Sequence, residues 1–206
     1  MIIEQMPRFF KPLKHVVVLV DMDHHSLNDL ARLVIWNLVA GVPYLSLFDT
    51  TGELYEHEEK LFYEVEKLKK GVPGCVKWAN KLPDLNGYTN GNSAHTLVVN
   101  IFRHRDGRKT VVECVQQIAE GSLVCKRNSR EFTAEELDEA LSQIYPAIPD
   151  PDMALYTGCL CSTKGLLPWQ IRLTVFVQLS TDHSINVDQY LGAIHKYSKC
   201  DQRFGK

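Results

Sequence analysis

Two carboxylates and two imidazoles follow one apolar segment within five residues. Residues 16–20 are all Val or Leu, and Asp21, Asp23, His24 and His25 come directly after them. Carboxylates and imidazoles bind divalent metal ions in proteins, and an aspartate carboxylate can also attack phosphorus as a nucleophile. The segment is therefore a candidate for metal binding or phosphoryl transfer, but we favour the interpretation that these polar residues cap the helix that follows.

The phosphoryl-transfer alternative requires further residues elsewhere in the chain. An Asp-x-Asp pattern after an apolar strand is typical of phosphatases of the haloacid dehalogenase type, in which Mg²⁺ shields the phosphate charge. Those enzymes place Thr or Val two residues after the second Asp, where this chain has His25. The Asp-His-His order is also typical of a class of metal phosphoesterases, but their other His and Asp clusters are missing here. A metal phosphatase using Asp21 and Asp23 is the weakest hypothesis.

The segments around these residues predict a strand, a helix and a second strand. His15–Val20 is an unbroken β-branched run, typical of a strand that is covered on both faces. Ser26 is expected to cap a helix with Asp29 at its third position, and Gly41 is expected to end it. Tyr44–Phe48 then predicts the second strand. A strand, crossover helix and strand of this length predict parallel neighbouring strands.

The same alternation continues through the rest of the chain. We expect a single α/β domain with a mostly parallel central sheet flanked by helices over residues 15–206, after an N-terminal extension over residues 1–14. The expected elements are a helix over Glu53–Lys70, a loop over Gly74–Ala94, a strand over Thr96–Phe102, a helix through Val111, Val112, Val115, Ile118 and Ala119, a helix capped by Thr133 and Glu136, a strand over Met153–Tyr156, an apolar segment of undecided structure over Leu167–Leu179, and a last helix capped by Asn186 and Gln189.

Composition excludes several classes of protein. The chain has 206 residues, of which 45% are hydrophobic and 23% charged, so it is neither disordered nor collagen-like. Its net charge of -2 lacks the basic excess of a dedicated nucleic-acid binder. No apolar stretch has the length of a signal peptide or a membrane-spanning helix. The six cysteines are therefore expected to be reduced and mostly buried thiols: Cys75, Cys114, Cys125, Cys159, Cys161 and Cys200.

Three motifs in the second half of the chain resemble those of one enzyme family. They are Pro149–Asp152 (Pro-Asp-Pro-Asp), Gly165–Thr174 (Gly-Leu-Leu-Pro-Trp-Gln-Ile-Arg-Leu-Thr) and Cys200–Lys206 (Cys-Asp-Gln-Arg-Phe-Gly-Lys). With the strand His15–Asp21 they resemble the cis-prenyltransferases over residues 15–206, and within that family the accessory subunits of the dehydrodolichyl diphosphate synthases. The resemblance implies the cis-prenyltransferase-like fold.

The chain departs from the catalytic members at both substrate sites. Catalytic members follow the first-strand Asp with Gly-Asn-Arg-Arg, which binds the allylic diphosphate, and use Arg-Thr-Ser-Gly and Arg-x-Ser for isopentenyl diphosphate. Tyr and Ser cannot replace the bidentate contacts of Arg with a diphosphate. The resemblance therefore implies a degenerate pocket without catalytic residues, with Asp21 as a weak candidate for metal binding. The corresponding residues of this chain are Asp21, Met22, Asp23, His24, His25, Tyr156, Ser162 and Lys164.

The C-terminus instead matches the family pattern. Arg203, Phe204 and Gly205 correspond to an Arg-x-Gly tail, which in the family reaches across the dimer and completes the partner's isopentenyl diphosphate site. A guanidinium group and the backbone N–H groups around a glycine both suit phosphate oxygens. The family's dimer interface lies near the equivalent of residues 166–179, so the candidate contact residues are Leu167, Trp169 and Arg172.

Together these features imply an accessory subunit that is inactive alone. It would join a catalytic cis-prenyltransferase subunit as a heterodimer or heterotetramer, with Mg²⁺ bound in the partner. The complex would condense isopentenyl diphosphate onto farnesyl diphosphate at the cytosolic face of the endoplasmic reticulum membrane. Its long-chain product would serve dolichol synthesis and protein glycosylation. The alternative is a non-enzymatic receptor or scaffold with a degenerate prenyltransferase fold.

Overall fold

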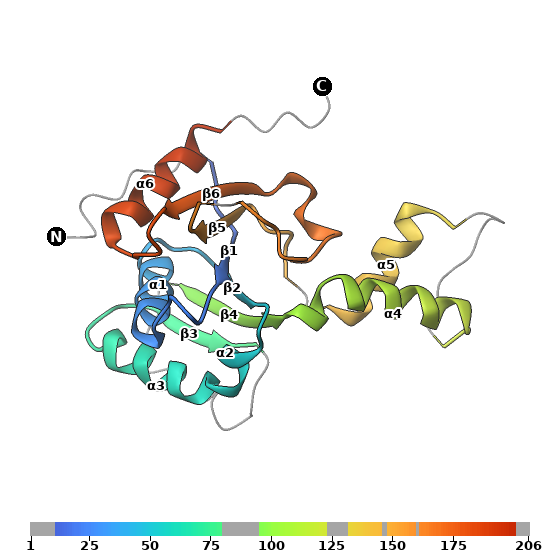
Figure 1. The fold of residues 1–206 in the computed structure, drawn as a ribbon, viewed down its shortest axis with the longest axis horizontal. Helices are drawn as coiled ribbons and strands as arrows, with labels where there is room; N and C mark the ends of the chain where they lie inside the picture. Colours follow the sequence, from blue (N-terminus) through green and yellow to red (C-terminus); the bar gives the residue numbers. More distant parts are fainter. Residues whose placement is uncertain (1–10, 80–94, 123–131, 146–147, 160, 201–206) are drawn as a thin grey trace.

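A six-stranded sheet forms the centre of the protein, in a computed structural model that describes residues 11–79, 95–122, 132–145, 148–159 and 161–200 (Figure 1). All paired strands are parallel, and their order is β3-β4-β2-β1-β5-β6. This confirms the predicted α/β fold with a parallel sheet. The strands are β1 His15–Val20, β2 Tyr44–Asp49, β3 Cys75–Trp78, β4 Thr96–Arg103, β5 Met153–Thr157 and β6 Val175–Ser180.

Strand β1 lies in the middle of the sheet, between β2 and β5. All six of its residues are buried, as its β-branched run predicts. The chain leaves β1 toward β2 on one side and returns later to β5 on the other. In open α/β sheets, ligands bind beyond the carboxyl ends of the strands at such a change of direction. The residues that follow Val20 are therefore placed where a ligand site is expected.

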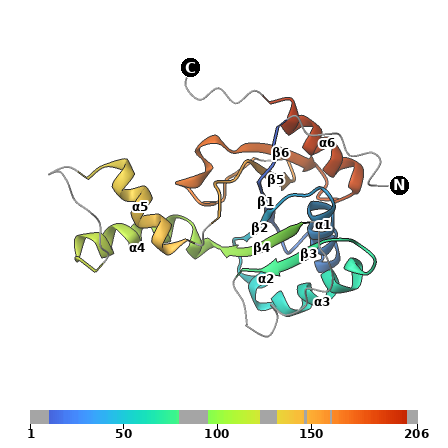
Figure 2. The same ribbon diagram turned by 180° about the vertical axis from the view of Figure 1, so that it is seen from behind.

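The helices cover one face of the sheet and extend beyond its edge (Figures 1 and 2). The main hydrophobic core lies between the sheet and α1, α3 and α6. Helices α4 and α5 project together away from the sheet in both views. The helices are α1 Leu27–Val39, α2 Glu53–Glu56, α3 Glu58–Lys69, α4 Arg108–Ala119, α5 Ala134–Ile144 and α6 Val187–Ser198, with 3₁₀ turns at η3 His104–Asp106 and η4 Gln170–Leu173.

The opposite face of the sheet is covered without a long helix. Val17 and Leu19 point to this face because side chains alternate along a strand. Leu166 and Leu167, from the segment between β5 and β6, are buried against them. This segment thus belongs to the fold of the subunit.

Three of the predicted helix starts are confirmed. Ser26, Thr133 and Asn186 each accept a hydrogen bond from the third residue of the following helix, and that residue's side chain bonds back to the cap. Each capping box satisfies two backbone N–H groups that the helix itself leaves unpaired.

Three other expectations are corrected. The helix expected over Glu53–Lys70 is two helices, because His57 adopts a non-helical conformation between them. The expected loop contains the edge strand β3, which has only four residues and so too short a pattern to reveal its period. The undecided segment Leu167–Leu179 forms η4 and then β6, because the chain becomes extended at Thr174.

The apolar spacing of α4 predicts the helix correctly but not its buried side. Its buried residues are Thr110 and Cys114, whereas Val112 and Val115 are 56% and 44% exposed. Within the described ranges, no helix combines the length and apolar composition that crossing a membrane requires. The cysteines in those ranges are free thiols, and Cys125 lies outside the described residues. The expectation of mostly buried thiols is wrong for this part of the chain, because only Cys75 and Cys114 are buried and the others lie in loops or after the last helix.

Candidate functional site

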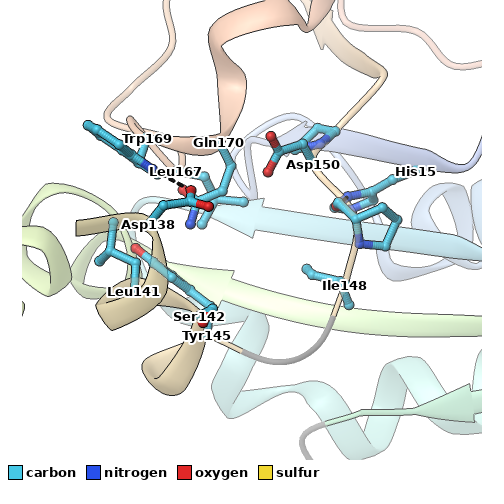
Figure 3. Close-up of a pocket in the computed structure, with 12 residues that line it drawn as sticks. His15, Asp138, Leu141, Ser142, Tyr145, Ile148, Asp150, Leu167, Trp169 and Gln170 are labelled. Carbon is cyan, nitrogen blue, oxygen red and sulfur yellow. Dashed lines mark hydrogen bonds between the residues drawn. The ribbon is translucent and has the colours of Figure 1, made fainter. Parts of the chain in front are cut away.

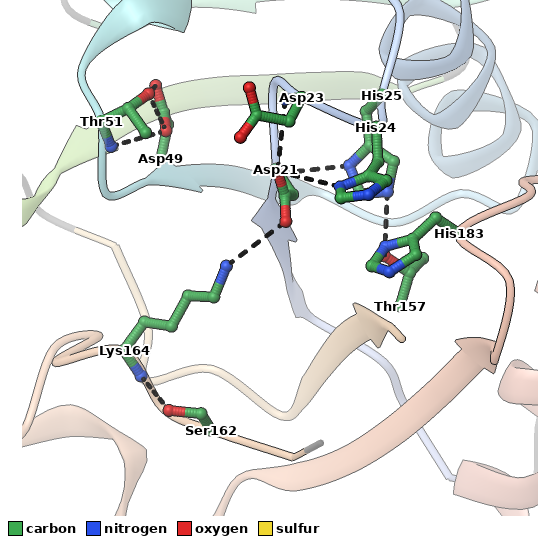
Figure 4. A network of polar contacts seen from close by, with 10 residues as sticks. All are labelled: Asp21, Asp23, His24, His25, Asp49, Thr51, Thr157, Ser162, Lys164 and His183. Atoms are coloured by element: carbon green, nitrogen blue, oxygen red, sulfur yellow. Dashed lines mark hydrogen bonds and ion pairs between the residues drawn. The ribbon is translucent and has the colours of Figure 1, made fainter. Parts of the chain in front are cut away.

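Polar side chains from the ends of three neighbouring strands meet at the carboxyl edge of the sheet (Figure 4). Asp21 follows β1, Thr157 ends β5, and His183 follows β6. Because β1, β5 and β6 are adjacent and parallel, residues far apart in the sequence become neighbours here.

The turn after β1 directs the side chains of Asp21 and Asp23 to different sides: Asp21 faces His24, and Asp23 faces away from it (Figure 4). The backbone N–H groups of His24 and His25 both donate to the carbonyl of Asp21, at 3.1 and 2.8 Å. The backbone N–H of Asp23 donates to Asp21 Oδ1 at 3.2 Å. Asp23 itself is exposed and its carboxylate points away from His24 and His25 (Figure 4). Asp21 is therefore the carboxylate of this turn that faces the cluster.

The carboxylate of Asp21 lies between two cationic or potentially cationic side chains. Its Oδ1 is 3.4 Å from His24 Nδ1, and its Oδ2 is 3.9 Å from Lys164 Nζ. Partial burial alone would raise the pKa of Asp21, but the hydrogen bond from His24 and the charge of Lys164 outweigh it. The pKa of Asp21 therefore lies below its ordinary value, and the group is ionised at neutral pH.

His25 is a buried link between β1 and β5. It is 3% exposed, its Nδ1 is 3.2 Å from the backbone nitrogen of Asp21, and its Nε2 is 2.9 Å from Thr157 Oγ1. A backbone N–H can only donate, so Nδ1 accepts and Nε2 carries the hydrogen donated to Thr157. Burial lowers the pKa of His25, which agrees with this neutral tautomer.

His183 completes the cluster, and no sequence motif indicated it. Its ring stacks on that of His24, with centroids 3.9 Å apart and planes at 14°. Its Nδ1 is 3.0 Å from Thr157 Oγ1. The ring also lies against Gly158, where an added Cβ would be 2.8 Å from His183 Cε1. His183 lies three residues after β6 ends at Ser180. Recognition of β6 in the sequence would therefore have placed His183 at the carboxyl edge of the sheet.

The remaining residues of the predicted pocket do not join the cluster. Met22 packs against the main core, and Tyr156 packs against the core of the opposite face. Ser162 accepts a hydrogen bond from the backbone N–H of Lys164 at 3.2 Å, so its role is local to that turn. Arg203, Phe204 and Gly205 lie outside the described residues.

This edge does not fit Mg²⁺ well. Mg²⁺ prefers six oxygen ligands and usually shares its shell with substrate phosphates. The cluster provides one carboxylate, Asp21, with an ammonium group already beside it and imidazoles around it. Nitrogen and oxygen donors do come together, however: ligand atoms of Asp21, His24 and His183 all lie within 4.8 Å of one another.

A separate cavity of about 280 Å³ lies over the face of the sheet opposite α1, α3 and α6, between His15 at the start of β1 and Tyr145 after α5 (Figure 3). Two of the predicted contact residues lie at or beside its rim: Trp169 Nε1 donates to Asp138 Oδ1 at 2.8 Å, and the guanidinium of Arg172 lies 5.1 Å from the Trp169 ring centroid. The third, Leu167, is only 2% exposed. The side chain of Leu167 therefore belongs to the hydrophobic core of the subunit and is not accessible to a partner in this conformation.

His15 is a fully buried residue in the lining of that cavity. Its Nδ1 is 2.7 Å from the carbonyl oxygen of Pro149 and its Nε2 is 2.8 Å from Ser46 Oγ. Because a carbonyl only accepts, Nδ1 carries the hydrogen and Ser46 donates to Nε2. Burial lowers the pKa of His15 to about 4, although the Pro149 hydrogen bond opposes the shift. Asp152 Oδ2 accepts from the backbone N–H of His15 at 3.0 Å, so the Pro-Asp-Pro-Asp motif holds the start of β1.

Comparison with curated proteins finds relatives that match most of the chain. The dehydrodolichyl diphosphate synthase complex subunit Nus1 of Mus musculus is 28% identical over 193 residues, which cover 93% of this chain and 64% of that protein. The subunit NUS1 of Homo sapiens is 29% identical over 200 residues, covering 95% and 67%. Tritrans,polycis-undecaprenyl-diphosphate synthase of Pyrococcus horikoshii is 29% identical over 146 residues, covering 68% and 50%. The chain thus spans about two thirds of the length of the mammalian subunits.

Solved structures share the fold at low sequence identity. Lavandulyl diphosphate synthase from Lavandula x intermedia, in complex with dimethylallyl diphosphate, superposes with a TM-score of 0.64 at 16% identity, covering 94% of this chain and 98% of that one. A probable undecaprenyl diphosphate synthase from Campylobacter jejuni gives a TM-score of 0.57 at 16% identity, covering 96% and 100%. No protein-family model matches the chain.

Proposed function

The chain belongs to the cis-prenyltransferase family, and we propose that it is the accessory subunit of a dehydrodolichyl diphosphate synthase complex. In the proposed complex, a catalytic cis-prenyltransferase subunit condenses isopentenyl diphosphate onto farnesyl diphosphate. The product is a long-chain polyprenyl diphosphate for dolichol synthesis and protein glycosylation. The site of action is the cytosolic face of the endoplasmic reticulum membrane.

The observation that carries the proposal is the pairing around Asp21. In a diphosphate site, cationic groups must be free to contact phosphate oxygens, preferably as guanidinium forks. Here Lys164 Nζ and His24 Nδ1 are both turned to the Asp21 carboxylate, and His25 is neutral and buried. Met22 and Asp23 stand where catalytic members have residues that bind the allylic diphosphate. These features support a subunit whose own cleft does not catalyse prenyl transfer.

The C-terminal tail gives this subunit a role in the partner's site. In the proposal, Arg203 contacts isopentenyl diphosphate bound to the catalytic subunit, and Gly205 lets neighbouring backbone N–H groups approach its phosphates. Helix α6 ends at Ser198, eight residues before the end of the chain at Lys206. Mg²⁺ is bound in the partner, since the edge of this sheet does not suit it.

The face that contains Trp169 and Arg172 is the proposed contact with the partner. Arg172 is exposed, and its neighbour Leu173 is 53% exposed, although it is apolar. Exposed apolar and Arg side chains are typical of interface centres. Leu167 supports this face from beneath, because it packs in the core under η4.

The test compares prenyl transfer by three preparations: this chain alone, the catalytic subunit alone, and the two co-expressed. The assay measures incorporation of isopentenyl diphosphate into products primed by farnesyl diphosphate, with Mg²⁺ present. We expect strong synthesis from the co-expressed pair and none from this chain alone. Robust turnover by this chain alone would contradict the proposal. A pair no more active than the catalytic subunit alone would also contradict it, and would favour the receptor or scaffold alternative.

The tail is tested separately in the assembled pair. Arg203→Ala should leave the subunits associated, lower turnover and raise the Michaelis constant for isopentenyl diphosphate. Lys199→Ala is the matched control, because it removes another exposed cation close to the same end of the chain. Equal kinetics for the two variants would remove Arg203 from the partner's site without changing the outcome of the first experiment.

A further inference from the structure

We propose that Asp21, His24 and His183 form a binding site for a divalent transition metal ion, of which Zn²⁺ is the representative. The site lies at the carboxyl edge of β1 and β6 and would join the turn after β1 to the loop before α6 (Figure 4). It is distinct from the Mg²⁺ that the proposed catalytic partner would hold. The inference concerns this chain alone and does not depend on the proposed complex.

The spacing of the donor atoms fits such an ion. Two ligands at 2.0–2.1 Å from a tetrahedral Zn²⁺ are roughly 3.3 Å apart. The separation of Asp21 Oδ1 and His24 Nδ1 is 3.4 Å. Ligand atoms of all three residues lie within 4.8 Å of one another. Because the two imidazole rings are stacked, the His183 ring would tilt out of the stack and move toward Asp21 so that both lone pairs point at one ion. Three protein ligands leave a fourth position for water.

Thr157 is placed to orient His183. Histidines that bind metals usually donate their second ring N–H to an oxygen, which fixes the tautomer. His183 Nδ1 is 3.0 Å from Thr157 Oγ1, so in the proposed metal-bound state Nδ1–H donates to the second lone pair of that oxygen and Nε2 binds the ion. Thr157 is itself held by His25, whose Nε2 is 2.9 Å from the same oxygen. The buried His25 therefore supports the position of Thr157, which contacts the partly exposed His183.

The chemistry of the donors selects the class of ion. Two imidazoles and one carboxylate suit Zn²⁺, Co²⁺ and Ni²⁺, whereas Mg²⁺ and Ca²⁺ prefer oxygen ligands. Lys164 lies beside Oδ2 and leaves Oδ1 available, so the carboxylate would bind through one oxygen. The repulsion between Lys164 and the ion is limited because its side chain is 37% exposed and can turn into solvent.

The ion can reach this site from solvent. His24 is exposed, and Asp21 and His183 are partly exposed. Neither histidine is needed to fill the hydrophobic core. Binding would separate the two rings, which stack with centroids 3.9 Å apart, without opening the hydrophobic core.

Zinc binding is measured by isothermal titration calorimetry on the 206-residue chain, in a Cys159→Ser, Cys161→Ser background. This background is needed because both of these thiols are exposed, and thiolates are Zn²⁺ ligands. We expect one Zn²⁺ per chain, and at least roughly a 10-fold weaker affinity in His24→Gln and in His183→Asn. Asn is chosen at 183 because the φ of 63° lies in the left-handed region, which Asn tolerates. His195→Gln, an exposed histidine of α6, is the matched control and should bind as the background does.

A second measurement does not depend on the variants folding. Zn²⁺ added to the background protein should shift the imidazole NMR resonances of His24 and His183 but not those of His195. Excess Mg²⁺ should not reverse the shifts. The proposal is overturned if no ion binds at one per chain, if all histidine variants bind equally, or if Mg²⁺ displaces Zn²⁺ from these residues.

Discussion

Each end of the sheet has a buried histidine held by a hydroxyl group, but the surroundings differ. At the amino end, His15 is 2.8 Å from Ser46 Oγ and fully enclosed. At the carboxyl end, His25 is 2.9 Å from Thr157 Oγ1, and two accessible histidines lie beside it. Both ring nitrogens of His15 and of His25 have hydrogen-bond partners. Among the described residues, the more accessible His24 and His183 each make one polar contact through a ring nitrogen, with Asp21 and with Thr157. Burial and the number of partnered nitrogens thus separate structural histidines from candidate ligands.

Replacing one histidine at each end gives the largest expected contrast. His15→Ala removes a fully buried ring and leaves Ser46 and the Pro149 carbonyl without partners, so we expect a loss of about 3–5 kcal/mol in the free energy of unfolding. His24→Ala, at an exposed position, should cost roughly 0.5 kcal/mol or less. Urea denaturation monitored by circular dichroism measures both. Similar losses of unfolding free energy in the two variants would show that His15 is no more important for stability than His24.

The pH dependence of stability should report the amino end. The pKa of His15 falls from 6.5 to about 4 on folding, so below pH 6.5 the unfolded chain binds a proton that the folded protein does not. The contribution of the neutral His15 to the free energy of unfolding is therefore complete above pH 6.5. It is lost progressively as the pH falls toward 4, by a total on the order of 3 kcal/mol. His15→Gln should make the unfolding free energy flatter by that amount between these pH values. Because the carboxylates titrate in both proteins, the difference between the two curves is the quantity to examine, and parallel curves would refute the assignment.

The sequence predicts the first half of the carboxyl-edge cluster but not the second. Asp21, His24 and His25 follow a strongly patterned strand, and Ser26 marks the next helix start, so their place at the sheet edge follows from local signals. His183 reaches them only because β5 and β6 pair in order beside β1. That strand order depends on packing between segments that are distant in the sequence. A local sequence pattern therefore cannot predict it.

The same distinction explains the corrections to the fold. Capping boxes are contacts within four residues, so sequence alone placed the starts of α1, α5 and α6. The exposure of Val112 and Val115 depends on where α4 lies relative to the sheet, and β3 is defined by its pairing with β4. Lys164 was expected in a second substrate site. Its contact with Asp21 arises from the path of the long segment between β5 and β6.

Gly158 tests how closely the backbone of β5 and the His183 ring depend on one another. Its φ is +82°, and an added Cβ would be 2.8 Å from His183 Cε1. Gly158→Ala should therefore cost about 1–2 kcal/mol in unfolding free energy and displace the His183 ring from His24. Gly192→Ala in α6 is the control, because no atom lies within 4 Å of its added Cβ and Ala favours helix by up to about 1 kcal/mol. Urea denaturation and the imidazole resonances of His183 measure the two effects; an undisturbed ring in Gly158→Ala would contradict the described packing.

Removing Lys164 should change the electrostatics of the carboxyl end with almost no change in stability. Lys164→Met takes away a cation 3.9 Å from Asp21 Oδ2, so the pKa of Asp21 should rise toward its ordinary value. The lowered pKa contributes stability above pH 3.8, which is lost as the pH falls through the folded value, and the variant should lose part of this contribution. Since the pair is partly exposed, its removal should cost less than about 0.5 kcal/mol. A carboxyl NMR titration of Asp21 checks the direction, with Lys67→Met as control because Lys67 pairs with Glu64 on α3. An equal Asp21 titration in both variants would mean that His24 alone, and not the cation from the β5–β6 segment, holds this carboxylate ionised.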